Sequence, residues 1–125
     1  MKANPVGWFE IYVQDMSRAK KFYETVFQTE LQPLNSPMPG FEFLAFPMTM
    51  ESYGAAGALV KMPGGPSGGN TTVVYFACED CAVEAGRVAG AGGSVEKTKM
   101  SIGEYGHIAL VRDSEGNMIG LHSMQ

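Results

Sequence analysis

The sequence contains an internal repeat with an offset of 65 residues, and this repeat limits the folds that the chain can adopt. At that offset residues 8–15 lie over residues 73–80. In both places a segment typical of a strand ends at an aspartate, Asp15 or Asp80, whose side chain is suited to cap a helix. Two copies of one supersecondary unit are the expected product of such a repeat.

Each half of the chain is predicted to have the order β-α-β-β-β. In the first half the strand at residues 8–13 precedes a helix capped by Asp15 or Ser17, and in the second half the strand at residues 72–78 precedes a helix at residues 81–91. Turn-forming residues separate three further strands in each half: residues 30–34, 41–47 and 56–61 in the first, and residues 94–100, 106–112 and 118–124 in the second.

These elements predict an α+β fold in which two βαβββ modules form a cup-shaped half-barrel, with helices outside and a cavity between the inner strand faces. We expect a single domain, residues 1–125, with module one at about 5–62 and module two at about 71–125. A Gly- and Pro-rich linker at about residues 63–70 joins them. On the first helix an apolar stripe is expected to pack in the core: Ala19, Phe22, Tyr23, Val26 and Phe27.

Composition limits the partners that the chain can have. With 125 residues, of which 45% are hydrophobic and 18% charged, it has the size and balance of one globular domain. A net charge of −4 without a Lys or Arg run argues against nucleic acid and against an anionic membrane surface. No apolar run approaches the roughly 20 residues of a membrane span, and the first residues lack a secretory signal, so a cytoplasmic location is expected.

The two cysteines, Cys78 and Cys81, form a single Cys-x-x-Cys. A structural zinc needs a second pair of ligands, and the two histidines, His107 and His122, are fifteen residues apart. A redox pair is the alternative, but two reduced thiols at a strand-to-helix turn are the favoured interpretation.

Two stretches resemble motifs of a known family. In the first, Val-Gln-Asp-Met at residues 13–16 is followed by Ala19, Phe22-Tyr23 and Val26-Phe27. In the second, residues 113–121 read Asp-Ser-Glu-Gly-Asn-Met-Ile-Gly-Leu, similar to an Asp-Pro-Asp-Gly-Asn-x-x-Glu-Leu ending. With these motifs the chain resembles the vicinal oxygen chelate superfamily, which includes glyoxalase I, bleomycin-resistance proteins and extradiol dioxygenases. Residues 101–106 look like its glyoxalase-related branch.

The resemblance covers essentially the whole chain and implies the two-module cup, but it does not carry over a metal site. Metal-dependent members place His, Glu or Gln at one inward position on the first and last strand of each repeat. The matching positions here are Trp8, a residue near Gly57, Val73 and Gly120. None of these offers a carboxylate, imidazole or thiolate to a divalent ion. We therefore expect no metal and no other cofactor.

The polar residues expected to point into the cup are Glu10, Tyr12, Tyr75 and His122, with Trp8 beside them. Glu10 and His122 are the candidate catalytic residues. Burial of Glu10 would favour its neutral form and suit it to acid–base work, whereas pairing with His122 would keep it charged. A rim carboxylate bonded to backbone, and a histidine satisfied near the chain end, are the alternatives.

The remaining candidate ligand-binding residues are Trp8, Tyr12, Tyr75, His107 and Tyr105. His107 begins a strand and is expected at the rim, and Tyr105 lies in a loop placed to close over the opening. Core packing is the alternative for Tyr12 and Tyr75. These residues supply aromatic walls with a few convergent polar groups, which is the usual form of a small-ligand site.

Three functions are consistent with these residues. The first is a metal-free, glyoxalase-like protein that binds a small organic molecule and acts by acid–base chemistry through Glu10 and His122. The second is a non-catalytic protein that sequesters a drug or metabolite, in which Glu10 meets a cationic group. The third, a metal-dependent lyase or dioxygenase with Glu10 and His122 as ligands, is disfavoured because two ligands are too few. We also expect a homodimer, as in relatives of this superfamily.

Overall fold

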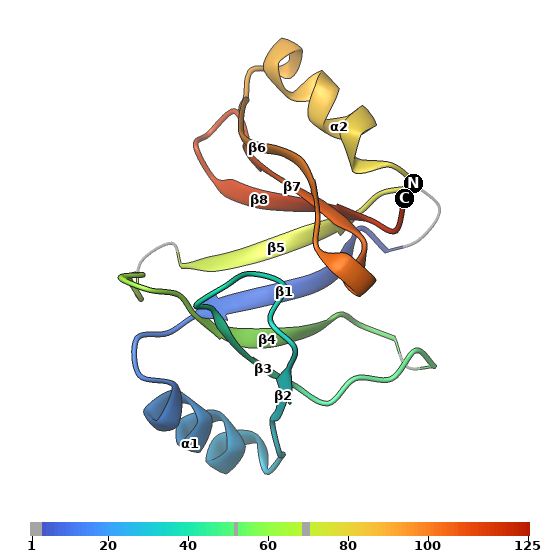
Figure 1. Cartoon of the computed structure of the whole chain (residues 1–125). Coiled ribbons are helices and arrows are strands. Elements are labelled where there is room, and N and C mark those ends of the chain that lie inside the picture. The colour runs from blue at the N-terminus through green and yellow to red at the C-terminus, as the bar shows by residue number, and fades with distance from the viewer. Residues whose placement is uncertain (1–3, 52, 69–70) are drawn as a thin grey trace. The chain divides into compact units, whose positions relative to one another are not determined.

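Figure 1 shows the computed structural model of the chain, which describes residues 4–51, 53–68 and 71–125. The chain divides into two compact units. The N-terminal unit is Trp8–Thr72, and the C-terminal unit combines Val73–Gln125 with the segment that ends at Gly7. Of the linker predicted at residues 63–70, Gly69 and Asn70 lie outside the described residues.

The N-terminal unit has the predicted β-α-β-β-β order. Its strands are arranged β2-β3-β4-β1, with β1 parallel to β4 and the other neighbours antiparallel. Parallel pairing of the first and last strands is possible because α1 and two strands intervene. The elements are β1 (Val6–Tyr12), α1 (Met16–Phe27), β2 (Gln32–Leu34), β3 (Glu42–Ala45) and β4 (Ala56–Lys61).

Local signals define both ends of α1. At its start the Asp15 carboxylate accepts a hydrogen bond of 3.0 Å from the backbone N–H of Arg18, so Asp15 rather than Ser17 is the cap. At its end Gln28 adopts a left-handed conformation with φ of 51°, and its N–H bonds to the carbonyl of Glu24. The chain then turns back toward the sheet, where the Leu31 N–H donates to the Glu24 carboxylate at 2.8 Å.

The sheet of the N-terminal unit has two apolar faces. The face under α1 packs around Met16, Leu31 and Leu59. Ile11 of β1 and Val13, which follows β1, pack against this cluster. We call the opposite face the inner face. It packs around Phe43, Ala58 and Val60, with these partly buried residues against them: Trp8, Tyr12, Leu34 and Phe41. Alternation along β1 thus separates the two faces as the sequence predicts.

The predicted apolar stripe of α1 is only partly buried. Ala19 and Tyr23 pack against the core, but Phe22, Val26 and Phe27 are 57%, 53% and 63% exposed. The expectation that all five stripe residues lie in the core was therefore wrong for these three. The stripe is wider than the strip of helix that meets the sheet, and the contact is centred on Met16, Ala19 and Tyr23.

The C-terminal unit repeats the order with two added turns of 3₁₀-helix. Its strands are arranged β5-β8-β7-β6, with β5 parallel to β8 and the other neighbours antiparallel. Under α2, the core packs around Cys81, Ala109, Val111 and Leu121. The elements are β5 (Thr72–Ala77), α2 (Cys81–Val88), η1 (Ala89–Ala91), β6 (Ser94–Ser101), η2 (Gly103–Tyr105), β7 (His107–Arg112) and β8 (Met118–Ser123).

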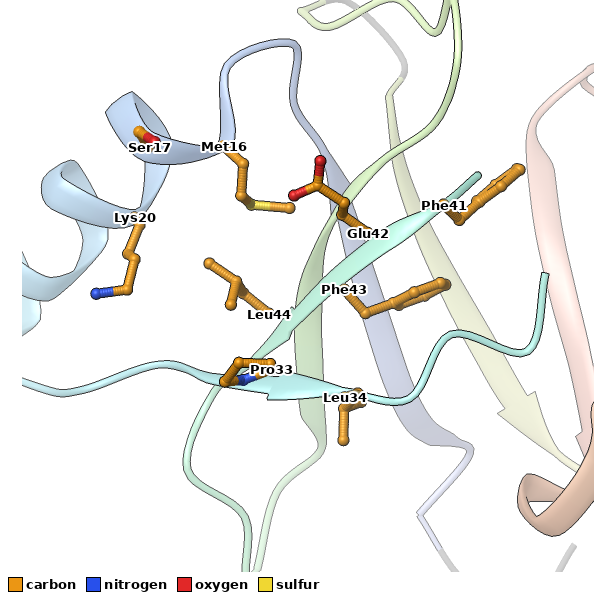
Figure 2. Close-up of a pocket in the computed structure, with 9 residues that line it drawn as sticks. All are labelled: Met16, Ser17, Lys20, Pro33, Leu34, Phe41, Glu42, Phe43 and Leu44. Carbon is orange, nitrogen blue, oxygen red and sulfur yellow. The ribbon is translucent and has the colours of Figure 1, made fainter. Parts of the chain in front are cut away.

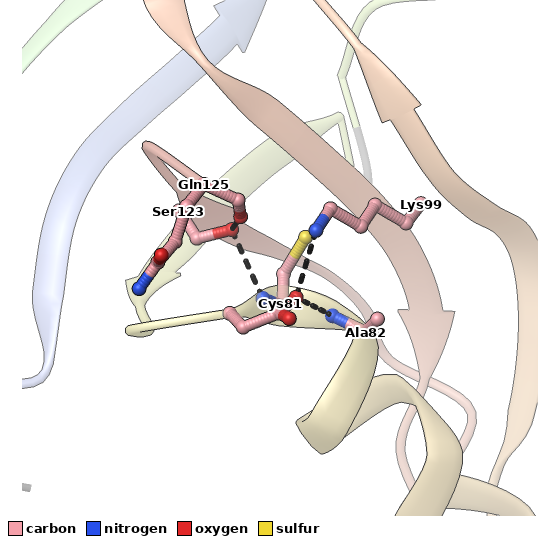
Figure 3. Close-up of polar contacts among 6 residues, drawn as sticks. Cys81, Ala82, Lys99, Ser123 and Gln125 are labelled. Atoms are coloured by element: carbon pink, nitrogen blue, oxygen red, sulfur yellow. Dashed lines mark hydrogen bonds and ion pairs between the residues drawn. The ribbon is translucent and has the colours of Figure 1, made fainter.

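The start of α2 is tied to the last strand of its unit (Figure 3). Asp80 caps the helix by accepting from the Ala82 N–H at 3.0 Å, and the Lys99 ammonium lies 2.8 Å from the same carboxylate. The Cys81 N–H donates 2.9 Å to the Ser123 hydroxyl, which in turn donates 2.7 Å to the carbonyl of Gln125. The backbone N–H groups at the start of α2 have no partner within the helix, and these side chains supply one. Such a partner is needed because Cys81 and Ser123 are buried away from water.

Within the described part of the chain, no helix is both long enough and apolar enough to cross a membrane.

Candidate functional site

Glu10 lies on the inner face, opposite Ala58 of β4, and is held there by two aromatic side chains of the same strand. The Tyr12 hydroxyl donates to Glu10 Oε1 at 2.8 Å, and the Trp8 indole N–H donates to Glu10 Oε2 at 3.2 Å. Residues two apart on a strand share a face, so β1 itself brings the three side chains together. This cluster of Trp8, Glu10 and Tyr12 is the strongest candidate site in the N-terminal unit.

Glu10 is only 7% exposed, which is unusual for an acidic residue. Burying a carboxylate is costly unless donors replace the lost water. The hydrogen bonds from Trp8 and Tyr12 replace part of that water. Both are neutral donors, so they stabilise the carboxylate without cancelling its charge. Around them the inner face is apolar, since Phe43, Ala58 and Val60 are buried and pack against Trp8 and Tyr12.

A groove of about 370 Å³ opens at strands β2 and β3 of the N-terminal unit (Figure 2). Leu34, Phe41 and Phe43 line it and also belong to the apolar inner-face core. The remaining lining comes from α1, β2 and β3 rather than from β1: Met16, Ser17, Lys20, Pro33, Glu42 and Leu44. The groove therefore adjoins the inner face at the β2 edge, and the carboxylate cluster lies on a different strand.

In the C-terminal unit Tyr75 is buried over Gly120. The two residues are opposite one another in the parallel β5–β8 pair, and a Cβ at position 120 would overlap the tyrosine ring. Tyr75 is 5% exposed. The glycine is required there because the ring takes the volume that any side chain at 120 would need.

His122 tethers the 3₁₀-helix η2. Its Nε2 lies 2.6 Å from the backbone carbonyl oxygen of Tyr105. A carbonyl only accepts, so Nε2 carries the proton of this bond, and Nδ1 is the ring atom left for proton exchange with a ligand. This contact brings together two of the predicted residues, His122 and Tyr105, but through the backbone of Tyr105 rather than its phenol. Burial, and then the neighbouring Glu104 carboxylate, raise the pKa of that phenol.

His107 lies on the other face of the β7–β8 pair from His122. His107 is opposite Ser123 and His122 is opposite Ile108, so alternation sends the two imidazoles to opposite sides. On the α2 side, where Ala109 also lies, Nδ1 of His107 is buried without a hydrogen-bond partner among the described residues. The structure thus separates His107 from the predicted residues Tyr75 and His122.

The two cysteines are unpaired thiols at the junction of β5 and α2. Burial raises the pKa of the Cys78 thiol to about 11, with added effects of the nearby Glu84 and Cys81. Cys81 is fully buried in the core under α2. A thiol with so high a pKa is a poor nucleophile and a poor metal ligand at neutral pH, which agrees with the interpretation of the pair as structural.

The positions expected to carry a metal do not fit one. Trp8 donates to Glu10, Val73 is buried, and Tyr75 covers Gly120. The strand register also narrows the position predicted near Gly57. Gly120 is opposite Tyr75, whose equivalent in the repeat is Glu10, and Glu10 is opposite Ala58 rather than Gly57. Among the residues that the structure describes, no three His, Cys, Asp or Glu side chains are grouped to hold a metal ion.

Sequence reasoning missed part of the site. It identified Trp8, Glu10 and Tyr12 through their alternation on β1, but not Phe43, Ala58 and Val60 on the neighbouring strands. The run of small and apolar residues at 56–60 was a usable signal for a strand buried on both faces. Pairing β4 parallel to β1 would have placed Ala58 beside Glu10 before the structure was known.

Comparisons with known proteins identify the family of this arrangement. The family model described as "Glyoxalase/Bleomycin resistance protein/Dioxygenase superfamily" matches residues 6–121. The match spans both units and nearly the whole chain, and it confirms the predicted family and fold class.

Two curated relatives, from Mycobacterium bovis and Mycobacterium tuberculosis, are both described as "Putative glyoxylase CFP32". Each is 29% identical over 119 residues, which is 92% of this chain and 44% of the relative. The chain therefore spans less than half the length of the curated relatives that it matches.

Solved structures share the fold at low sequence identity. A variant of methylmalonyl-CoA epimerase from Streptomyces coelicolor, in complex with 2-nitronate-propionyl-CoA, aligns with a TM-score of 0.68 at 16% identity, covering 96% of each chain. Methylmalonyl-CoA epimerase from Mycobacterium tuberculosis gives 0.68 at 14%, covering 100% of this chain and 93% of that one. A hypothetical protein, BH1468 of Bacillus halodurans, gives 0.74 at 11%, covering 99% and 96%.

Proposed function

Because the chain belongs to the glyoxalase/bleomycin resistance protein/dioxygenase superfamily, we propose that it binds a small organic molecule on the inner face of its N-terminal unit, beside Glu10. The observation that carries the proposal is the buried Glu10 carboxylate, held by Trp8 and Tyr12 on an otherwise apolar surface. A few convergent polar groups on an apolar, aromatic background are the common design of small-ligand sites.

The first form of this function is acid–base chemistry without a metal. Glu10 would accept a proton from the ligand. In the C-terminal unit, His122 is the candidate for proton exchange, and it would use Nδ1 because its Nε2 is engaged with Tyr105. Support for Glu10 in this role comes from its burial on an otherwise apolar face, with both carboxylate oxygens oriented by Trp8 and Tyr12. No step needs a cofactor. Purified protein is expected to hold less than about one tenth of an equivalent of Ni, Zn, Fe or Mn.

The second form is sequestration of a drug or metabolite without turnover. The aromatic residues favour it, because the Trp8 ring supplies stacking area at low entropic cost and Phe41 stacks on Phe43 with ring centroids 6.4 Å apart. Here the Glu10 cluster would anchor a polar group of the ligand. A metal-dependent lyase or dioxygenase is not proposed, because the ligand positions do not fit a metal.

Trp8 is the only tryptophan of the sequence, so its fluorescence reports on the proposed site directly. A panel of small aromatic and acyl compounds is titrated into the full chain, and saturable changes in Trp8 emission identify binders. Glu10→Gln then separates the two forms of the function. Loss of turnover with binding retained supports acid–base catalysis, and turnover absent from wild type with binding present supports sequestration. A panel without any saturable binder contradicts both.

We also propose a homodimer. Its support is that each unit has an edge strand, β2 in one and β6 in the other, whose outer hydrogen-bonding side needs covering. Sedimentation at micromolar concentration is expected to give twice the chain mass of 13.4 kDa. A single species at the chain mass contradicts it. We further propose a cytoplasmic location, where the unpaired thiols of Cys78 and Cys81 would stay reduced.

A further inference from the structure

We propose that the groove between α1 and β3 is a second binding site, and that it takes an α-amino acid with a large apolar side chain in its zwitterionic form. The inference goes beyond the proposed function, because α1, β2 and β3 line the groove whereas the cluster around Glu10 lies on β1. All residues of the groove belong to the N-terminal unit.

The groove has the size and the surface of a site for a small apolar group. Its volume of about 370 Å³ lies within the range of about 300–1,000 Å³ that is usual for small-ligand sites. Met16 and Leu44 belong to the core under α1, and Phe43 belongs to the inner-face core, so these three lining residues are held by packing. The flexible thioether of Met16 can adapt to the outline of a ligand. An apolar side chain such as that of leucine or phenylalanine suits this surface.

Two opposite charges line the groove, one on each side (Figure 2). Lys20 projects from α1, one turn after Met16. Glu42 projects from β3 and, two residues before Leu44, shares the strand face that α1 covers. Among the described residues Lys20 forms its ion pair with Glu24, at 2.9 Å, and not with Glu42. A ligand with one charge would therefore be attracted by one side of the groove and repelled by the other, whereas a zwitterion matches both.

The ion pair with Glu24 orients Lys20 and leaves it able to bind a ligand. Glu24 Oε1 accepts from the ammonium, and Glu24 Oε2 accepts from the backbone N–H of Leu31 at 2.8 Å. An ammonium has three donors, so Lys20 can also donate to a carboxylate in the groove. Ser17, exposed on the same helix, adds a hydroxyl donor. The exposed carboxylate of Glu42 can accept from an ammonium, so the two charged groups of an amino acid each have a partner.

Three probes with one side chain test the charge requirement: L-phenylalanine, its amide and its N-acetyl derivative. The amide keeps only the positive charge, and the N-acetyl compound keeps only the negative one. NMR titration of the full chain with methyl-labelled Met and Leu measures affinity and location together. We expect phenylalanine to bind with a Kd on the order of 1 mM and to shift the methyl signals of Met16 and Leu44. Each derivative should bind about fivefold more weakly, since partly exposed charge pairs contribute little.

Each outcome decides the inference. Equal or tighter binding of either derivative overturns the zwitterion as the ligand, and absence of a saturable shift up to about 20 mM overturns the site. Glu10→Gln should leave the affinity for phenylalanine unchanged, and a loss in that variant would place the ligand on the inner face instead. Failure of the groove leaves the proposed function intact, because the panel titrated against Trp8 fluorescence tests that function separately.

Two variants assign the sides of the groove. Lys20→Met keeps the apolar stem and removes the charge, so the preference for phenylalanine over its amide should fall from about fivefold to none. Glu42→Gln should likewise remove the preference over the N-acetyl derivative. The matched controls are Lys21→Met and Glu51→Gln, at exposed residues outside the groove lining, and they should keep both preferences.

Circular dichroism and thermal melts accompany each titration. A preference over the amide that persists in folded Lys20→Met overturns the role of the lysine, and a preference over the N-acetyl derivative that persists in folded Glu42→Gln overturns the role of the glutamate. Should one variant fail to fold, the other variant and the order of the three probes still decide the inference.

Discussion

Tyr12 donates a hydrogen bond of 2.8 Å to Glu10, two residues earlier on the same face of β1. The bond forms because of local strand geometry, but its importance depends on residues of a neighbouring strand. The alternation of a strand alone is enough to bring the side chains together, but only the surrounding inner face makes the bond important, because Ala58 and Val60 keep water away from it. Stability and proposed function therefore depend on the same contact.

Removing the Tyr12 hydroxyl should destabilise the fold. Tyr12→Phe leaves the buried Glu10 carboxylate without one of its donors, and we expect the free energy of unfolding to fall by about 1–3 kcal/mol. Urea denaturation followed by circular dichroism measures this. Tyr53→Phe removes the same atom from a side chain that is 98% exposed and should leave the midpoint unchanged. Equal midpoints for Tyr12→Phe and wild type would show that the bond contributes no net stability.

A methyl group at position 120 should also be destabilising. In Gly120→Ala the new Cβ overlaps the buried Tyr75 ring, and such overpacking in a core costs about 1–3 kcal/mol. Gly86→Ala is the matched control, because no atom lies within 4 Å of its added Cβ, and it should gain up to about 1 kcal/mol as an alanine inside α2. Chemical denaturation of both variants checks the opposite signs. A second test is the Tyr75→Leu background, in which the cost of Gly120→Ala should shrink; an unchanged cost would exclude the ring as its cause.

Ser123 should be essential to the start of α2. Its buried hydroxyl accepts from the Cys81 N–H and donates to the Gln125 carbonyl, so Ser123→Ala leaves both backbone groups without this partner. We expect a loss of about 1–3 kcal/mol in the free energy of unfolding. Faster amide exchange at Cys81, measured by NMR, should accompany it. Ser114→Ala, at an exposed turn residue, is the control and should have little effect; normal exchange at Cys81 in Ser123→Ala would refute the assignment.

Stability should decrease in acid because three carboxyl groups are engaged in the folded state. The Lys99 ammonium lowers the pKa of Asp80, the side chain and backbone of Asn117 lower that of Asp113, and the Leu31 N–H followed by Lys20 lowers that of Glu24. Their ordinary values are 3.8 for the aspartates and 4.5 for the glutamate. A lowered pKa in the folded state means that each group contributes stability above its unfolded value and loses it as pH falls through the folded one.

Thermal melts between about pH 6 and pH 2 measure that loss, and the midpoint should fall most steeply below about pH 4. Asp80→Asn should show a shallower fall, since its contribution has already been removed. Glu51→Gln, at an exposed loop residue, should follow wild type. A profile of Asp80→Asn that is parallel to wild type would mean that the contact with Lys99 contributes nothing to the pH dependence.

The order of helices and strands could be predicted from the sequence because it depends on local signals. The caps Asp15 and Asp80, the alternation on β1 and the glycine after η1 each act over a few residues. Burial was less predictable. Phe22, Val26 and Phe27 have apolar spacing, yet which part of a wide stripe meets the sheet depends on how α1 lies across β4, and spacing alone does not contain that angle.

The candidate site divides in the same way. Trp8, Glu10 and Tyr12 are neighbours on one strand, so the alternation already predicted that they share a face. The bond from His122 to Tyr105 could not be predicted, because it uses a backbone carbonyl whose position depends on the 3₁₀-helix η2. The position opposite Glu10 could be predicted only as a residue near Gly57, because the register of β1 on β4, which selects Ala58, is a property of the assembled sheet.

The register of the two parallel strand pairs has a consequence for how this chain tolerates change. Glu10 opposite Ala58 and Tyr75 opposite Gly120 occupy equivalent places in the repeat, yet one is an acid held by donors and the other is a ring that fills space. Substitution at Tyr75 is limited by volume, whereas substitution at Glu10 is limited by charge. Equivalent positions of the two halves are thus constrained in different ways, so the residues that one half accepts give no guide to those that the other half accepts.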